Sequence, residues 1–257
     1  MVGGRSARLV LREATKPRHY LALARALRVY KRPFSNLKRY LLVRGTYPHQ
    51  CELRTPCGTV TPLLHHPHDI ITVHEIFCRE DYKTSGTARV VVDVGSNIGI
   101  SALYFLTRHP AVRCYLYEPV SENVAKLEAN LAAFRGRYEL ERVAVADRTG
   151  TASFGVEESG RYGGIGVPTG QTIEVECVEI NEVLERVLAA HERIDVLKLD
   201  TEGAEVATVR AIRLEHLQRI ATIYYEVPRR ESLHRELFDE HFANQTMRLR
   251  NRALSGT

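Results

Sequence analysis

The chain has 257 residues, 44% of them hydrophobic, and a formal net charge of +5 at pH 7. That length accommodates one full α/β core and excludes two complete enzyme domains. No apolar run approaches the roughly 18 to 20 residues that a membrane-spanning helix needs, and the five cysteines contain no CxxC pair. We therefore expect a reduced, cytoplasmic protein without a secretory signal, a disulfide scaffold or a cysteine zinc site.

Residues 1–48 are predicted to form a basic N-terminal helical extension. Residues 1–40 contain eleven Lys or Arg against the single acid Glu13, a local net charge of +10, while the other 217 residues sum to −5. Clustered cations favour an anionic partner such as a membrane surface, nucleic acid or an acidic glycan, and the alternative is a solvated extension.

A helix is predicted from residue 18 to residue 30, because Tyr20, Leu23, Leu27 and Tyr30 recur at helical spacing. Pro33 follows it, and we expect the chain to leave the helix before that residue. Basic residues interrupt the neighbouring apolar row, so few buried contacts are expected from residues 1–30.

Between this arm and the main domain we predict a hairpin and a short helix. Residues 51–55 and 59–64 flank a Pro-Cys-Gly turn, and a helix is expected from Asp69, as its N-cap, to Phe77. Four histidines surround Asp69 (His65, His66, His68 and His74). Their spacing matches no zinc motif, so the segment is interpreted as a solvated loop.

From Val90 onward, strands and helices alternate with short links, which predicts a doubly wound α/β fold with a mostly parallel sheet. The domain is placed at residues 49–257, with a cofactor-binding core at 88–228. The predicted strands are 90–94, 114–117, 140–145, 151–156, 171–178, 194–199 and 220–225, and the predicted helices are 98–107, 121–134, 181–190 and 203–213. After Pro228 a helix at 231–242 and one strand at 246–250 predict a short or incomplete terminal hairpin.

A glycine turn follows the first strand of this core: Asp93-Val94-Gly95-Ser96-Asn97-Ile98-Gly99. Glycines at such a turn let the backbone approach a ligand, and the next helix offers unpaired N–H groups. A dinucleotide-binding turn is the competing interpretation, but it needs a second glycine where Asn97 stands. With Asp93 adding negative charge, a ligand with a cationic amino group and no phosphate is favoured, as in S-adenosylmethionine.

The second strand ends at Glu118-Pro119. A carboxylate there can accept two hydrogen bonds from a ribose diol, in nicotinamide and adenosyl cofactors alike. The alternative is an exposed acid at the start of a helix.

The third acidic feature follows the strand at 194–199, in Lys198-Leu199-Asp200-Thr201-Glu202-Gly203-Ala204-Glu205. Three carboxylates so close together need a shared cation or proton, although Glu205 alone fits the first turn of a helix. The Asp/Asn-Pro-Pro-Tyr type of sequence, with which many N-methylating enzymes hold a planar nitrogen, is missing at this position. The acceptor is therefore expected to be an oxygen.

The chain resembles the FkbM-type methyltransferases from about Asp69 to Glu226. The resemblance rests on the glycine turn and Lys-x-Asp-x-Glu-Gly-x-Glu, and on Glu75-Ile76-Phe77, Tyr82, Glu118-Pro119, Asn130, Ala144, Asp147, Gly150 and Phe154. It implies a class I, Rossmann-like methyltransferase fold and O-methylation of a sugar, glycan, glycolipid or secondary metabolite. It also implies that the glycine turn, Glu118 and the segment from Arg142 through Val143 to Ala144 surround the cofactor S-adenosylmethionine.

The candidate general bases are Asp200, ranked first, Glu202 and Glu226, because all three follow strands whose carboxyl ends share one edge. Asp200 or Glu226 could also hold a hard cation such as Mg²⁺, but no metal is predicted. Two alternatives stay open: an RNA methyltransferase that uses the basic arm, and a module that binds adenosylmethionine without catalysis. Nucleic acid is not the favoured partner, because no aromatic-rich basic platform accompanies the arm.

Overall fold

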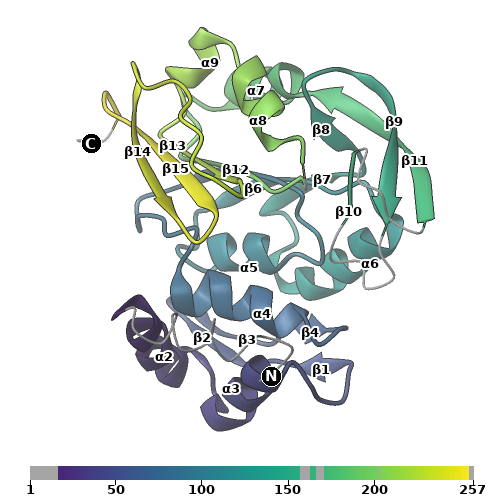
Figure 1. Cartoon of the computed structure of the whole chain (residues 1–257), viewed down its shortest axis with the longest axis vertical. Helices are drawn as coiled ribbons and strands as arrows, with labels where there is room; N and C mark the ends of the chain where they lie inside the picture. Colours follow the sequence, from purple (N-terminus) through teal and green to yellow (C-terminus); the bar gives the residue numbers. More distant parts are fainter. Residues whose placement is uncertain (1–16, 157–162, 166–170, 202, 255–257) are drawn as a thin grey trace. The chain divides into compact units, whose positions relative to one another are not determined.

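The computed structural model describes residues 17–156, 163–165, 171–201 and 203–254. It divides into two compact units, residues 1–83 and 84–257 (Figure 1). The sequence places a boundary at residue 48 instead. Several contacts join residues 17–30 to the segment beyond that point; among them, Arg25 forms an ion pair with Glu80 at 2.9 Å, and Tyr30 forms a β-bridge with Leu53. No helix in the described ranges is both long and apolar enough to cross a membrane.

The N-terminal unit begins with α2 (Pro17–Val29) and α3 (Pro33–Leu42). The second of these helices was not expected, because Pro33 was interpreted only as the end of the first. A proline in the first turn of a helix loses no hydrogen bond, since that N–H has no intrahelical acceptor. Pro33 therefore ends one helix and begins the next.

Helix α2 packs mainly through a face other than the apolar stripe from which the helix was predicted. Ala22 and Ala26 are each 2% exposed or less, whereas Leu23 and Leu27 of the stripe are about half exposed and only its last residue, Tyr30, is buried. Small alanines allow close backbone approach, and Tyr30 fills the remaining space. The expectation of few buried contacts is therefore wrong for residues 20–30, and residues 1–16 lie outside the described ranges.

Short strands and a helix complete this unit. The predicted hairpin is β2 (Leu53–Thr55) and β3 (Gly58–Val60), and β1 (His49–Gln50) pairs with β4 (Leu63–Leu64). The predicted helix is α4 (Asp69–Val73), continued by the π-helix η1 (His74–Arg79).

Asp69 is not the N-cap of α4, which corrects the sequence interpretation. Its Oδ2 accepts hydrogen bonds from the backbone N–H groups of His65 at 2.6 Å and His66 at 2.9 Å, so the carboxylate fastens the preceding turn. The ring of His74 stacks on Tyr40 with centroids 3.9 Å apart. Among the described residues these histidines form no metal-like group.

The C-terminal unit is built on a seven-stranded sheet with the order β14-β15-β13-β12-β5-β6-β7. Five strands are parallel, and β15 runs antiparallel to both of its neighbours. The strands are β5 (Val90–Val94), β6 (Arg113–Tyr117), β7 (Tyr138–Glu141), β12 (Val196–Leu199), β13 (Thr222–Glu226), β14 (Phe238–Ala243) and β15 (Thr246–Asn251). The doubly wound, mostly parallel, Rossmann-like prediction is confirmed. The strand order reverses between β5 and β12, where open α/β sheets bind ligands.

Helices cover both faces of this sheet (Figure 1). α5 (Ile100–Leu106) and α6 (Ser121–Asn130), which is followed by the 3-10 turn η2 (Ala132–Phe134), lie on one side; α7 (Ile180–Ala190), α8 (Glu205–Ala211) and α9 (Leu214–Leu217) lie on the other.

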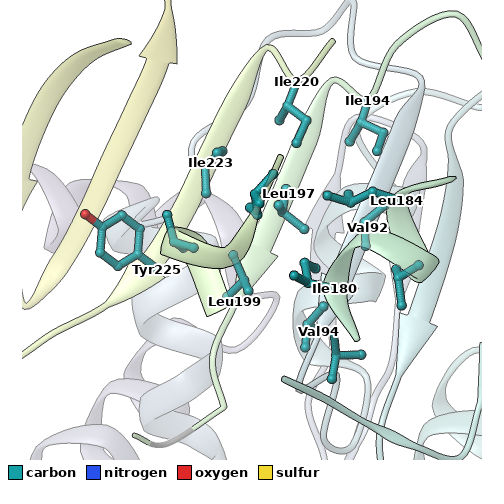
Figure 2. Packing of buried hydrophobic residues seen from close by; sticks show 14 of the residues in the cluster. Val92, Val94, Ile180, Leu184, Ile194, Leu197, Leu199, Ile220, Ile223 and Tyr225 are labelled. Carbon is teal, nitrogen blue, oxygen red and sulfur yellow. The ribbon is translucent and has the colours of Figure 1, made fainter. Parts of the chain in front are cut away.

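Figure 2 shows the core on the α7 side, where alternate strand residues such as Val92 and Leu197 meet Leu184. Because strand side chains alternate, Asp93 and Lys198 belong to the opposite face, which α5 covers.

The segment predicted as one strand at 140–145 is two strands in two sheets. β7 ends at Glu141, and β8 (Ala144–Ala146) belongs to a four-stranded sheet with the order β10-β9-β11-β8. Its other members are β9 (Gly150–Val156), β10 (Gly163–Ile165) and β11 (Gln171–Glu179). This second sheet is an insertion between β7 and α7.

The terminal hairpin is complete, and the predicted helix at 231–242 is wrong. Residues 238–243 form β14, which pairs with β15 from Phe238 opposite Asn251 to Ala243 opposite Thr246. Asn244 and Gln245 link the strands with φ values of 54° and 64°, as the tightest hairpin turns require. The apolar residues with helical spacing here, Leu233, Leu237, Phe238 and Phe242, belong to or pack against one core cluster, but they reach it from a loop, a turn and β14 instead of from a helix face.

Candidate functional site

The strand register brings the predicted site residues to one edge of the seven-stranded sheet. Val94 is paired with Tyr117 on β6 and with Leu199 on β12, and these pair onward with Glu141 and Tyr225. The next residue of each strand therefore lies along the carboxyl edge: Gly95, Glu118, Arg142, Asp200 and Glu226.

Gly95 is the residue that joins the turn to the neighbouring strand end. Its φ is +73°, and a β-carbon built on it would lie 1.9 Å from the main-chain oxygen of Asp200. Its N–H donates to the carbonyl of Tyr117 at 2.9 Å, and the N–H of Ser96 donates to the same oxygen at 3.1 Å. Only glycine satisfies both the torsion and the close approach.

The other turn residues divide into exposed and buried positions. Asn97 is partly exposed, with φ of +48°, whereas Ser96 is buried and donates to the carbonyl of Asp93 at 2.7 Å. At Gly99, the N-cap of α5, a β-carbon would lie 3.0 Å from Cγ of Leu127, so this glycine permits close packing of α6. Gly95 and Asn97 are the turn residues that a ligand could contact.

Glu118 is 4% exposed at the end of β6. Its Oε2 accepts from the N–H of Asn97 at 2.9 Å, and Oε1 accepts from the N–H of Val120 at 3.1 Å and from Nδ2 of Asn123 at 3.2 Å. Burial raises the pKa of this carboxyl group, and the three hydrogen bonds together with Lys198 oppose the rise. Three of about four acceptor positions are in use, so one is left for a ribose hydroxyl.

Asp93 is fully buried and faces Lys198, its register partner on β12. The Lys198 ammonium forms an ion pair with Oδ1 of Asp93 at 3.0 Å that lacks aligned hydrogen-bond geometry, and a second at 3.4 Å with Oδ2 of Asp200. It donates to the carbonyl of Gly95 at 2.8 Å. Burial opposes the charge of Lys198, but the two carboxylates outweigh burial and raise its pKa. Asp93 therefore acts inside the protein, through the lysine that fastens the turn.

Asp200 and Glu226 keep accessible carboxylates. The side chain of Asp200 is 31% exposed, and Glu226 is exposed at the end of β13. Glu202 lies outside the described residues. Glu205 is buried at the start of α8 and accepts from the N–H groups of Thr201 at 2.7 Å and Gly203 at 2.8 Å, as expected of a helix-start acid.

Val143 and Ala144 are buried at the link from β7 to β8, at 8% and 5% exposure. They can offer main-chain groups or an apolar wall to a ligand. The exposed residue of this segment is Arg142, which donates to Oγ of Ser121 at 3.1 Å.

Sequence reasoning missed two residues that hold the site carboxylates. Ser101 of α5 donates to Oδ2 of Asp93 at 2.6 Å, and Asn123 of α6 donates to Glu118. Each lies in the first turn of the helix that follows its strand, and that position is the only sequence signal that would have suggested it. Lys198 appeared in the motif, but only the register identifies Asp93 as its partner.

A model of the methyltransferase FkbM domain matches residues 93–248. The 31-O-demethyl-FK506 methyltransferase FkbM of Streptomyces tacrolimicus is 26% identical over 212 residues, which cover 68% of this chain and 80% of that protein. The AMB antimetabolite synthetase AmbE of Pseudomonas aeruginosa is 28% identical over 60% of this chain, which spans only 9% of AmbE.

Among solved structures, methyltransferase FkbM from Methylobacillus flagellatus KT is 14% identical with a TM-score of 0.40. The match covers 62% of this chain and 43% of that one.

Proposed function

The chain belongs to the FkbM methyltransferase family, and from this premise we propose that it transfers a methyl group from S-adenosylmethionine to a hydroxyl oxygen. The acceptor class is a sugar, glycan, glycolipid or secondary metabolite. One observation supports the proposal most strongly: Gly95 packs against the main chain of Asp200 at the sheet edge where Glu118 also lies. The proposed nucleoside site and the proposed proton acceptor are therefore adjacent.

The residues present fit this cofactor. A glycine without room for a β-carbon lets a ligand approach the main chain of the turn, and Glu118 offers a buried acceptor for a ribose hydroxyl. Glu118 and Asn97 are hydrogen-bonded to each other, so the ribose acceptor and the turn hold a fixed spacing. A bulky pyrophosphate would meet Asn97 where dinucleotide-binding turns have glycine.

When bound, S-adenosylmethionine supplies a methyl group on a sulfonium, whose neutral departure needs no acid. The residues of this chain then have three tasks: they orient the hydroxyl, exclude water and accept its proton. Asp200 is the first candidate for the proton, because Lys198 holds its Oδ2 in place while the carboxylate stays accessible. Glu226 lies next to it along the edge.

The name of one relative and a missing motif support an oxygen acceptor. The name of the Streptomyces tacrolimicus relative describes methylation of 31-O-demethyl-FK506, and the family match includes the Lys-x-Asp motif that contains Asp200. The sequence there also lacks the motif with which many N-methylating enzymes hold a planar nitrogen.

The test combines binding with transfer. The full chain is titrated calorimetrically with S-adenosylmethionine, its demethylated product and NAD in parallel. The titrations identify which cofactor the chain binds. Methyl-labelled cofactor is then incubated with fractionated glycan, lipid, RNA and small-molecule pools, with Asp200→Asn as the control for enzyme-dependent label. We expect adenosylmethionine binding and label in an alkali-stable ether of a non-RNA pool.

Three results would contradict this proposal. Affinity for NAD alone would remove the methyltransferase assignment. Label in RNA, with steep salt dependence, would favour an RNA methyltransferase. Tight cofactor binding without label in any pool would indicate a binding module.

A further inference from the structure

Large hydrophobic side chains are exposed mainly in the first two helices. Of the nine that are exposed in the described residues, seven lie between residues 20 and 42. Single exposed leucines are ordinary, but so dense a group in one short segment indicates an interaction surface.

Helix α2 carries the first stripe. Tyr20, Leu23 and Leu27 are 63%, 45% and 48% exposed, and their spacing of three and four residues places them on one face. Ala22 and Ala26, on the neighbouring face, are buried in the N-terminal unit. The apolar stripe is therefore additional to the face that this helix uses for folding.

Helix α3, which contacts α2 and follows it after three residues, repeats the arrangement. Phe34 and Leu41, seven residues apart and so on one face, are 82% and 54% exposed, while Leu37 is buried. Lys38 is exposed beside them.

The charge of this segment has one sign. Residues 17–45 contain eight Lys or Arg and no Asp or Glu. Arg28 in α2 and Lys38 in α3 are both exposed. Exposed leucines beside such a basic field are the pattern of helices that lie in the plane of an anionic bilayer surface.

We propose that α2 and α3 dock on an anionic lipid bilayer, with the leucines and Phe34 in the interface and the basic side chains on the lipid phosphates. This binding is independent of the methyl-transfer proposal. A nucleic acid backbone would use the cations but leaves the leucines without a role. A second copy of the chain would bring two fields of the same sign together. Of these three partners, only an anionic bilayer accounts for both the exposed leucines and the basic side chains.

The test is flotation of the full chain with phosphatidylcholine vesicles, with and without phosphatidylglycerol. One variant, Leu23→Gln with Leu27→Gln, removes apolar contact, and another, Arg28→Gln with Lys38→Gln, removes charge. The matched control is Leu214→Gln with Arg135→Gln, which changes an exposed leucine and an exposed arginine of the other unit.

Wild type and control should float only with anionic vesicles. The partition coefficient should fall at least about tenfold in each α2/α3 variant. Thermal melts should be unchanged, because all four positions are at least partly exposed. If the leucine pair unfolds the chain, Phe34→Gln, at the most exposed of these positions, replaces it and should reduce binding several-fold.

Any one of the following outcomes overturns the proposal. Wild type does not float, or floats equally well without phosphatidylglycerol. The leucine variant floats like wild type while deletion of residues 1–16 abolishes flotation, which would place the binding in those residues. A dimer in sedimentation dissociates on the leucine substitutions. The chain binds RNA, and this binding falls when Arg28 and Lys38 are substituted but not when Leu23 and Leu27 are.

Discussion

The main-chain oxygen of Asp200 lies 1.9 Å from the point that a β-carbon on Gly95 would occupy. The glycine turn after β5 and the carboxylate motif after β12, about a hundred residues apart in the sequence, are therefore in contact. A ligand seated on the turn would be next to the proposed base, and a change at Gly95 should disturb both.

Gly95→Ala should destabilise the fold by about 2–4 kcal/mol, because the methyl group meets a backbone oxygen that cannot move aside without shifting β12. Gly136→Ala is the matched control: it also has positive φ, at +83°, but no atom lies within 4 Å of the new carbon. The free energy of unfolding of Gly136→Ala should fall by only about 1 kcal/mol. Urea unfolding measures both, and equal losses would show that torsion rather than contact fixes glycine at position 95.

Glu118→Ala should weaken S-adenosylmethionine binding by at least about tenfold, because hydrogen bonds to a charged acceptor contribute about 1.5–3 kcal/mol each. Asn123→Ala removes one donor to the same carboxylate but keeps the charge, and should weaken binding less than about threefold. Calorimetry on both variants checks the pair. A larger loss for Asn123→Ala would mean that the asparagine, not the acid, contacts the cofactor.

The pH dependence of stability should also report on Glu118. Burial raises its pKa above the ordinary 4.5, so the folded chain holds this proton more tightly than the unfolded chain. As the pH rises from about 4.5 through the raised pKa, the free energy of unfolding of wild type should fall relative to that of Glu118→Gln. Below that window the free energies of unfolding of the two proteins should change in parallel. Cofactor affinity of wild type should rise over the same window as the carboxylate ionises. A constant difference between the two proteins across these pH values contradicts the shift.

The parts of the fold that could be predicted are those in which one strand or helix determines its own pattern. The run Val90–Val94 is apolar because both sheet faces are covered, and the turn after it has glycines because its torsions demand them. Both could therefore be recognised without knowing any neighbour. The edge residues Glu118 and Asp200 could be placed for the same reason, since each directly follows such a strand.

The rest depended on partners distant in the sequence. The helical spacing near 231–242 did not indicate a helix, because residues 231–237 form a loop and a turn and residues 238–243 form β14, which is fixed by its pairing with β15. The stripe Tyr20, Leu23 and Leu27 indicated a helix, but not that Ala22 and Ala26 would form its buried face. Likewise, only the register reveals that Asp93 faces Lys198.

Lys198→Met should destabilise the chain by about 3–5 kcal/mol, because it leaves Asp93 buried without its cation. In the double variant with Asp93→Asn the uncompensated charge is gone, so the loss should be smaller than the sum of the two single losses. A urea double-mutant cycle gives the coupling. Additive losses would show that the ion pair contributes nothing beyond packing.

Asp200→Asn should lower turnover by about two to four orders of magnitude with little change in cofactor affinity, because it keeps the size of the side chain but removes its ability to accept a proton. The Lys198 ammonium lies 3.4 Å from Oδ2 of Asp200, so the substitution also changes this contact. A thermal melt checks that the fold persists. Glu226→Gln, the next acid along the edge, is the comparison: if Asp200 is the base, this variant should keep turnover within about tenfold. Loss of cofactor affinity in Asp200→Asn, with turnover at saturation retained, would assign Asp200 to cofactor binding. A collapse of turnover in Glu226→Gln alone would instead assign the proton to Glu226, at the end of β13.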